Sequence, residues 1–230
     1  MTDLRDLASY DVDGAMVIAA VQGPSGNLGS YGDADRPVRT ASLVKLLVAL
    51  EVWTIPVSAR TGRDRQLIDA MLRRSDDDAC TELWDTYGED SIVTAQVKAL
   101  GLTGTAPPTT RGMWGWATMS ARDLITALRH IESLLDGQQR TSFLAALAGA
   151  ETRGADDFDQ RFGLFRPGGR AVPVKQGWMT VDDRRYLHSV ALLGDGSAAA
   201  VLTATRPGAT WEDARALIDG VTARVLAGAS

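Results

Sequence analysis

Hydrophobic residues along the chain follow two different repeats, one typical of strands and one typical of helices. Residues 15–32 have the pattern of a hairpin: an apolar strand, a turn rich in Gly, Pro, Ser and Asn, and a second short strand. Towards the other end, three apolar runs at 171–179, 185–194 and 198–206 have the length of strands. We therefore expect strands near both ends of the chain.

The segment between these strands, and the last twenty or so residues, have the spacing of helices. Thr40 and Ser120 are small polar residues that directly precede two of these segments, where helix caps are expected. A loop at 103–119, with two prolines and two tryptophans, interrupts the helical order. The predicted helices cover residues 41–53, 62–73, 76–87, 89–100, 121–135, 138–148 and 210–228.

Neither terminal group of strands carries a full core alone, so we expect them to pair in one antiparallel sheet covered by helices. The prediction is an α/β fold in α–β–α layers, built as one domain over residues 1–230. The sheet part would comprise about 1–60 and 150–230, with an inserted helical part at about 61–149. A chain of 230 residues that is 45% hydrophobic is large enough to bury such a core.

Charge and composition narrow the partners. A net charge of −5 gives no basic surface for nucleic acid, and no apolar stretch reaches the roughly 20 residues that span a membrane. Residues 1–14 lack a charged-then-apolar signal pattern, so a cytoplasmic location is expected; an extracytoplasmic one is the alternative if a signal has been removed. Cys80 is the only cysteine, and the acidic residues lack metal-ligand spacing, so we expect no disulfide, metal or cofactor.

Lysine is rare in this chain. Of the 24 basic residues 21 are arginine, and the lysines are Lys45, Lys98 and Lys175. Lys45 lies in the apolar run 41–53, where burial favours an uncharged amine over an ammonium. Arginine cannot lose its proton in a protein, whereas a buried lysine can. A chemical role for Lys45 is therefore a hypothesis; a lysine that extends from a surface helix to water is the alternative.

Ser42 precedes Lys45 by three residues, so the two side chains share one face of a helix. In the first helical turn, free N–H groups favour a developing negative charge on the Ser42 oxygen. A neutral amine beside a hydroxyl can accept its proton and so create a nucleophile. The spacing therefore predicts a serine nucleophile with a lysine base.

Two further motifs extend this pattern. Ser75-Asp76-Asp77 lies at a break between two predicted helices, and Lys175-Gln176-Gly177 lies on a predicted strand. The order and the placement are those of the Ser-x-x-Lys, Ser-Asp-Asn and Lys-Thr-Gly motifs. The chain thus resembles the serine β-lactamases and penicillin-binding proteins, most of all small class A-like serine hydrolases of actinobacteria. The resemblance implies the β-lactamase/DD-peptidase-like fold.

The resemblance also implies roles for individual residues. Ser42 would be the nucleophile and Lys45 its base, while Ser75 would pass a proton to the leaving group. Lys175 would supply positive charge and a hydrogen bond to Ser75. The backbone N–H groups of Ser42 and Trp178 would form the oxyanion hole, a feature that stabilises the transition state by about 3–4 kcal/mol.

The chain departs from the family pattern at several points. Only 33 positions separate Ser42 from Ser75, which implies a reduced helical lobe. Asp77 replaces an asparagine, and a carboxylate only accepts hydrogen bonds. Gln176 replaces a threonine whose hydroxyl helps to bind a substrate carboxylate. Gly177 is retained and would let a substrate backbone lie along the strand. The two replacements argue against ordinary penicillin-like ligands.

The loop at 103–118 lacks any Asp or Glu, although the family's deacylating glutamate lies on this loop. We therefore expect no useful β-lactamase activity. Trp114 and Trp116 would line an acyl pocket or simply anchor the loop, and Arg111 would bind a substrate carboxylate. His188 is expected to be structural.

The leading interpretation is a serine hydrolase or acyltransferase that attacks an amide or ester of a small peptide-like substrate. Two alternatives stay open: a non-catalytic ligand-binding descendant of the fold, and a non-covalent acid–base enzyme or cyclase in natural-product biosynthesis. The sequence makes no prediction of oligomeric state.

Overall fold

A computed structural model describes residues 14–133, 137–165 and 172–228 of the chain. Residues 1–13, on which the cytoplasmic expectation depends, lie outside this part, as do the ends of the predicted segments 121–135 and 171–179. The strands are β1 Met16–Gln22, β2 Leu28–Tyr31, β3 Val38–Arg39, β4 Thr118–Met119, β5 Val174–Val181, β6 Arg184–Leu192 and β7 Ala198–Ala204. The α-helices are α1 Lys45–Thr54, α2 Gly62–Arg73, α3 Asp77–Tyr87, α4 Asp90–Leu100, α5 Ala121–Ser133, α6 Gly137–Ala148 and α7 Trp211–Gly228.

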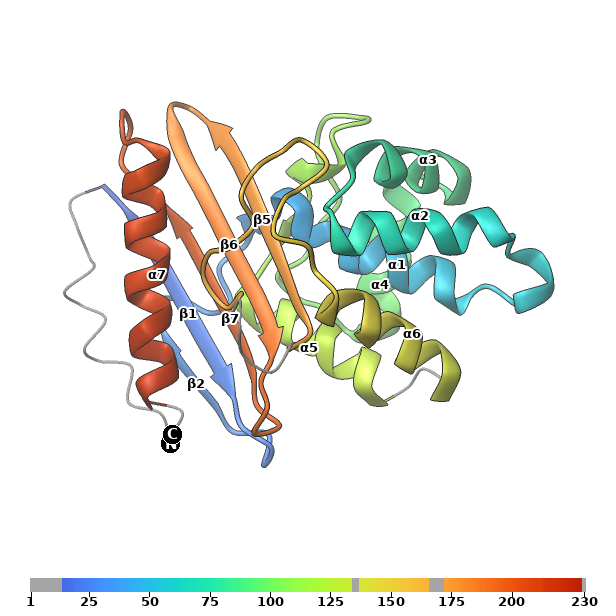
Figure 1. The fold of residues 1–230 in the computed structure, drawn as a ribbon, viewed down its shortest axis with the longest axis horizontal. Coiled ribbons are helices and arrows are strands. Elements are labelled where there is room, and N and C mark those ends of the chain that lie inside the picture. The colour runs from blue at the N-terminus through green and yellow to red at the C-terminus, as the bar shows by residue number, and fades with distance from the viewer. Residues whose placement is uncertain (1–13, 134–136, 166–171, 229–230) are drawn as a thin grey trace.

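Five strands form one antiparallel sheet in the order β2-β1-β7-β6-β5 (Figure 1). The hairpin expected at 15–32 supplies one edge, and the three late strands complete the sheet, as predicted. β7 lies in the centre and is buried at all seven positions, including a run of alanines that lets helices approach closely. β5 forms the other edge, and it is the edge nearest the helical lobe.

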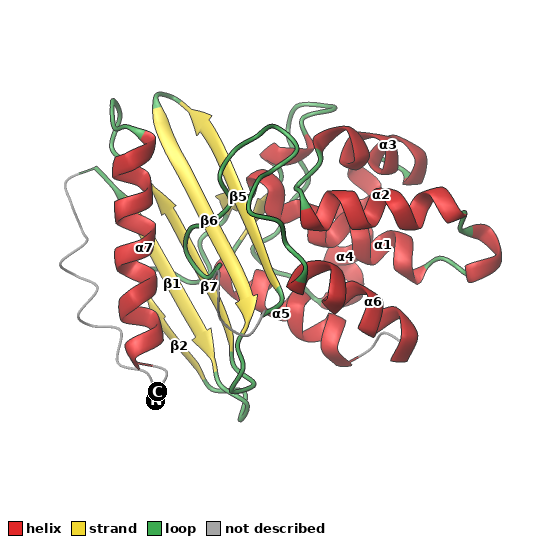
Figure 2. Ribbon diagram, viewed as in Figure 1, coloured by secondary structure: helices red, strands yellow, loops and turns green. Residues whose placement is uncertain are grey.

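Helices cover both faces of this sheet (Figure 2). On one face, α7 packs its buried residues Ala214, Ile218, Val221 and Val225 against the sheet. On the other face lie the remaining α-helices, which share a larger apolar core with the sheet. Leu46–Leu50 of α1 are completely buried in that core, so α1 forms its centre. The α–β–α layers and the antiparallel sheet agree with the predicted fold class.

The start of the α1 segment differs from the prediction. Residues Ala41–Val44 form a 3₁₀ turn, and the α-helix begins only at Lys45. Thr40 has a helical backbone and its side chain makes no capping bond, so the predicted cap is wrong. The Thr40 hydroxyl instead lies 3.2 Å from the Ala41 carbonyl oxygen. By contrast, the Ser120 hydroxyl accepts a hydrogen bond from the Asp123 N–H, as expected of a cap on α5.

Candidate active site

The predicted nucleophile and base lie at the junction of the 3₁₀ turn and α1. A 3₁₀ helix has three residues per turn, so the side chains of Ser42 and Lys45 start on the same side of the chain. Ser42 is 6% exposed and Lys45 is completely buried. Ala41, just before Ser42, has a φ of +47°, a left-handed conformation that a residue with a side chain rarely adopts. The backbone thus bends sharply at the residue before the predicted nucleophile.

The side-chain nitrogen of Lys45 contacts three oxygens of the second motif. Its Nζ lies 2.6 Å from the Ser75 carbonyl oxygen, 3.3 Å from Ser75 Oγ and 2.5 Å from Asp77 Oδ1. No bond joins it to Ser42, whose hydroxyl has no hydrogen-bond partner among the described residues. Catalytic contacts are often long in a free enzyme, so this geometry is compatible with a base that turns to Ser42 when substrate binds.

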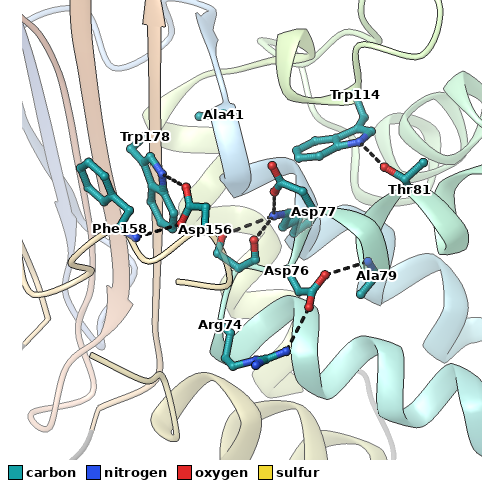
Figure 3. A network of polar contacts seen from close by, with 12 residues as sticks. Ala41, Arg74, Asp76, Asp77, Ala79, Thr81, Trp114, Asp156, Phe158 and Trp178 are labelled. Carbon is teal, nitrogen blue, oxygen red and sulfur yellow. Dashed lines mark hydrogen bonds and ion pairs between the residues drawn. The ribbon is translucent and has the colours of Figure 1, made fainter. Parts of the chain in front are cut away.

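Ser75 lies at the junction between α2 and α3, with a φ of +54°. Asp76 caps α3 by accepting a hydrogen bond from the Ala79 N–H, and Arg74 pairs with the same carboxylate (Figure 3). These contacts hold the backbone on both sides of Ser75, which keeps its hydroxyl directed at the two lysines.

Lys175 reaches the same hydroxyl from the sheet. Its Nζ lies 2.9 Å from Ser75 Oγ and 2.8 Å from the Gln176 carbonyl oxygen, and the residue is fully buried. Burial, and next the charge of Lys45, hold the pKa of Lys175 well below its ordinary value. The Ser75 hydroxyl thus lies within hydrogen-bond distance of the side-chain nitrogens of both lysines.

The edge strand β5 passes directly beside the 3₁₀ turn. A Cβ added at Gly177 would lie 2.9 Å from the Thr40 carbonyl oxygen and 3.2 Å from the Ser42 nitrogen, so only glycine fits without a shift. The close approach brings the Ser42 nitrogen next to β5, and Trp178, the next residue on β5, lines the same cavity as Ser42. An oxyanion hole formed by the N–H groups of Ser42 and Trp178 stays a prediction.

Trp178 is held by a loop that precedes β5. Its indole Nε1 donates to Asp156 Oδ2 at 3.0 Å, and its ring stacks on Phe158 with centroids 4.9 Å apart (Figure 3). Neither Asp156 nor Phe158 was expected at the site, because residues 154–161 have the composition of a solvent-exposed loop. Nothing in their local pattern marks a contact with β5.

A cavity of about 280 Å³ opens over Ser42. We call it the Ser42 cavity. Trp114 forms one wall: its Nε1 donates to Thr81 Oγ1 at 3.2 Å, and its ring centroid lies 4.8 Å from Lys45 Nζ (Figure 3). The loop that lacks an acidic residue thus contributes an indole to the site. The lining residues are Ala41, Ser42, Asp77, Gly112, Met113, Trp114, Gly115, Trp116, Trp178 and Met179.

Two of the predicted substrate-binding residues lie away from the cavity. The Arg111 guanidinium pairs with both oxygens of Glu89, at 2.9 and 2.8 Å, and the residue is not part of the lining. Gln176 is 1% exposed, and strand alternation puts its side chain on the face of β5 opposite Lys175. The structure thus brings Asp77, Trp114, Trp116 and Trp178 to the cavity but neither Arg111 nor the Gln176 side chain.

His188 has the structural placement that was expected. Its ring is completely buried, with Nε2 3.0 Å from the Arg39 carbonyl oxygen and Nδ1 2.9 Å from that of Leu187. Burial lowers its pKa from 6.5 to about 4, although both carbonyls favour the charged ring. His188 therefore joins β6 to the segment that leads into the 3₁₀ turn.

Solved structures with the same fold include class A β-lactamases. The chain superimposes on the enzyme from Mycobacterium abscessus with a TM-score of 0.77 at 20% identity, covering 97% of each chain. For a class A β-lactamase from Bacteroides cellulosilyticus the TM-score is 0.76 at 15% identity, with 98% of this chain and 95% of that chain covered. For the β-lactamase of Sphaerobacter thermophilus the TM-score is 0.74 at 19% identity, with 97% of this chain and 95% of that chain covered. This chain has the serine β-lactamase fold.

Among curated proteins, "Putative lipoprotein LppW" of Mycobacterium tuberculosis is 33% identical over 190 residues, which are 77% of this chain. The same name and values apply to the protein of Mycobacterium bovis. The matched part spans 58% of the length of these relatives. No protein-family model matches the chain.

Two searches of the described residues bear on other functions. No helix among them is long and apolar enough to cross a membrane. No group of three or more His, Cys, Asp or Glu side chains in the same residues is placed to hold a metal ion.

Proposed function

We propose that the protein is a serine hydrolase or acyltransferase that forms an acyl-enzyme on Ser42. The observation that carries the proposal is the junction of three motifs: both buried lysines reach Ser75, beside a serine that borders the cavity. A cavity bordered by a serine, with two buried lysines beside it that share the Ser75 hydroxyl, is suited to acyl transfer.

In the proposed reaction the Ser42 oxygen attacks an amide or ester carbonyl while its proton passes to the Lys45 amine. The negative charge on the carbonyl oxygen is then stabilised by the N–H groups of Ser42 and Trp178. Ser75, bonded to both lysines, delivers a proton to the departing amine or alcohol as the bond to it breaks. Water or a second nucleophile then takes the acyl group from Ser42.

Active-site labelling tests this proposal. A neutral fluorophosphonate reacts with activated serines, and intact-protein mass reports the adduct. We expect one adduct on the wild-type protein and none on Ser42→Ala. Ser133→Ala serves as the matched control, because among the described residues that exposed hydroxyl bonds only to carbonyls of its own helix. Labelling that persists in Ser42→Ala would contradict the proposal.

A second candidate, a ligand-binding protein or a non-covalent acid–base enzyme, is favoured by one observation. Lys45 is engaged by Asp77 at 2.5 Å, while the Ser42 hydroxyl has no partner among the described residues. In that case no fluorophosphonate adduct forms, and Ser42→Ala leaves ligand binding or turnover largely intact.

The location of the protein bears on its substrate. The relatives' name, lipoprotein, favours the extracytoplasmic alternative over the cytoplasmic expectation. We propose that the protein acts outside the cytoplasm, where peptide-like components of the cell envelope are available. Fractionation of cells that express the native reading frame tests this, and recovery only in the cytoplasmic fraction would contradict it.

A further inference from the structure

The Ser42 cavity is bordered by one acidic side chain. Asp77 is the only residue with an ionisable side chain among those that line it. Its side chain is 67% exposed, and Oδ1 takes the bond from Lys45. The other carboxylate oxygen, Oδ2, has no hydrogen-bond partner among the described residues, so it offers an acceptor to a bound molecule.

The walls of the cavity suit the same kind of ligand. Trp114, Trp116 and Trp178 all contribute to the lining. Faces of tryptophan rings attract cations, and carboxylate–aromatic sites are typical of ammonium recognition. The ring of Trp114 already has a basic side chain beside it, since Lys45 Nζ lies 4.8 Å from the centroid.

Basic side chains, by contrast, are absent from the residues that line the Ser42 cavity. Lys45 and Lys175 are completely buried and bonded to the second motif. Arg39 lies over the Trp116 ring at 4.6 Å without joining the lining, and Arg111 is paired with Glu89. A substrate carboxylate in the cavity would thus meet Asp77 and no cation among the lining residues.

We propose that the ligand of the Ser42 cavity carries a cationic group, an ammonium or guanidinium, that binds Asp77 Oδ2 between the indole rings. The claim that this ligand is the substrate rests on the proposed function. The claim that the cavity binds a cation does not. Asp77 then acts as a specificity residue: its charge selects a cation and repels the carboxylate that penicillins carry.

Three small probes of matched shape test the inference by binding alone. Choline, 3,3-dimethylbutan-1-ol and 3,3-dimethylbutyrate all have one branched end of the same shape. That end is a cation in choline and uncharged in the other two, and the butyrate carries a carboxylate at its other end. Tryptophan fluorescence or calorimetry on the wild-type protein gives each Kd. We expect choline to bind at least about fivefold more tightly than the alcohol, and the butyrate to bind most weakly.

Two variants separate the site from general charge effects. Asp77→Asn should bring the choline-to-alcohol ratio close to one, whereas Asp78→Asn, the same charge change on the next exposed residue of α3, should leave it unchanged. Trp114→Leu should also reduce the ratio. Equal affinities for the three probes, no choline binding, or a preference that survives Asp77→Asn would overturn the inference.

The two proposals fail in different ways. A preference for choline without a fluorophosphonate adduct would support the cationic ligand and contradict the acyl-enzyme. An adduct on Ser42 without a preference for choline would support the acyl-enzyme and contradict the cationic ligand.

Discussion

At the scale of single residues, the account depends on what lysine can do and arginine cannot. Lys45 and Lys175 are buried side by side around one hydroxyl, in a chain that otherwise uses arginine for 21 of its 24 basic positions. Lys98, the third lysine, lies exposed in the last turn of α4. In the sequence, the rarity of lysine and the apolar surroundings pointed to Lys45, and the Lys175-Gln176-Gly177 motif pointed to Lys175.

Replacing Lys45 by arginine keeps a positive charge but removes a group that can accept a proton. We expect Lys45→Arg to lower the rate of fluorophosphonate labelling by about 10²–10⁴-fold, with Lys98→Arg unchanged. Thermal unfolding of each variant checks that the fold is retained. A folded Lys45→Arg protein that labels at the wild-type rate would show that Lys45 is not the base and would direct attention to Lys175.

His188 predicts a dependence of stability on pH. Its pKa is 6.5 in the unfolded chain and about 4 in the fold, so between these values only the unfolded state binds the proton. The free energy of unfolding should therefore fall as the pH drops from 6.5 to 4, by about 3 kcal/mol from this residue.

Urea unfolding of wild type and His188→Gln measures that contribution. Acidic residues titrate in both proteins, so the difference between the two curves reports His188. The difference in the free energy of unfolding between wild type and His188→Gln should become steadily smaller below pH 6.5. A constant difference would mean that the buried ring titrates with an ordinary pKa.

At the scale of elements, the site is made by contact between the edge strand β5 and the 3₁₀ turn. Gly177→Ala would place a methyl group against the Thr40 carbonyl and the Ser42 nitrogen. We expect a loss of about 1–3 kcal/mol in the free energy of unfolding and strongly reduced labelling of Ser42. Gly194→Ala is the control, because an added Cβ there meets nothing within 4 Å. Normal labelling of Gly177→Ala would argue against an oxyanion hole at this contact.

Periodicity predicted the helices and strands well because each depends on a local pattern. The predicted segments 62–73, 76–87 and 89–100 differ from α2, α3 and α4 by at most one residue at either end. The 3₁₀ turn before α1 was not predictable in this way, since its sequence has the same apolar spacing as a helix. The placement of Trp178 by Asp156 and Phe158 was also out of reach, because it joins residues about twenty positions apart.

At the scale of the whole molecule, the chain has the fold of class A β-lactamases, but the side chains at its Ser42 cavity depart from the family motifs. The loop at 103–118 contributes Trp114 instead of a carboxylate, and Asp77 brings negative charge to the Ser42 cavity. The three motifs were enough to predict the fold, and the structure brings Ser42, Lys45, Ser75 and Lys175 together. The positions of the Arg111 and Gln176 side chains depend on tertiary contacts that the sequence does not reveal.

These differences predict that the protein does not turn over β-lactams usefully. Penicillin or a chromogenic cephalosporin should react slowly with Ser42 or not at all, and any adduct seen by intact-protein mass should persist. The physical reason is the lack of an acidic residue on the loop to activate the deacylating water, together with repulsion of the β-lactam carboxylate by Asp77. Rapid turnover that depends on Ser42 would contradict this prediction.

The central claim is that Ser42 is an activated nucleophile. Its most direct test is peptide mapping of the wild-type protein after incubation with a fluorophosphonate, which reports the labelled residue itself. We expect a single modified peptide, with the added mass on Ser42. An unmodified Ser42, or a label distributed over exposed serines, would contradict it.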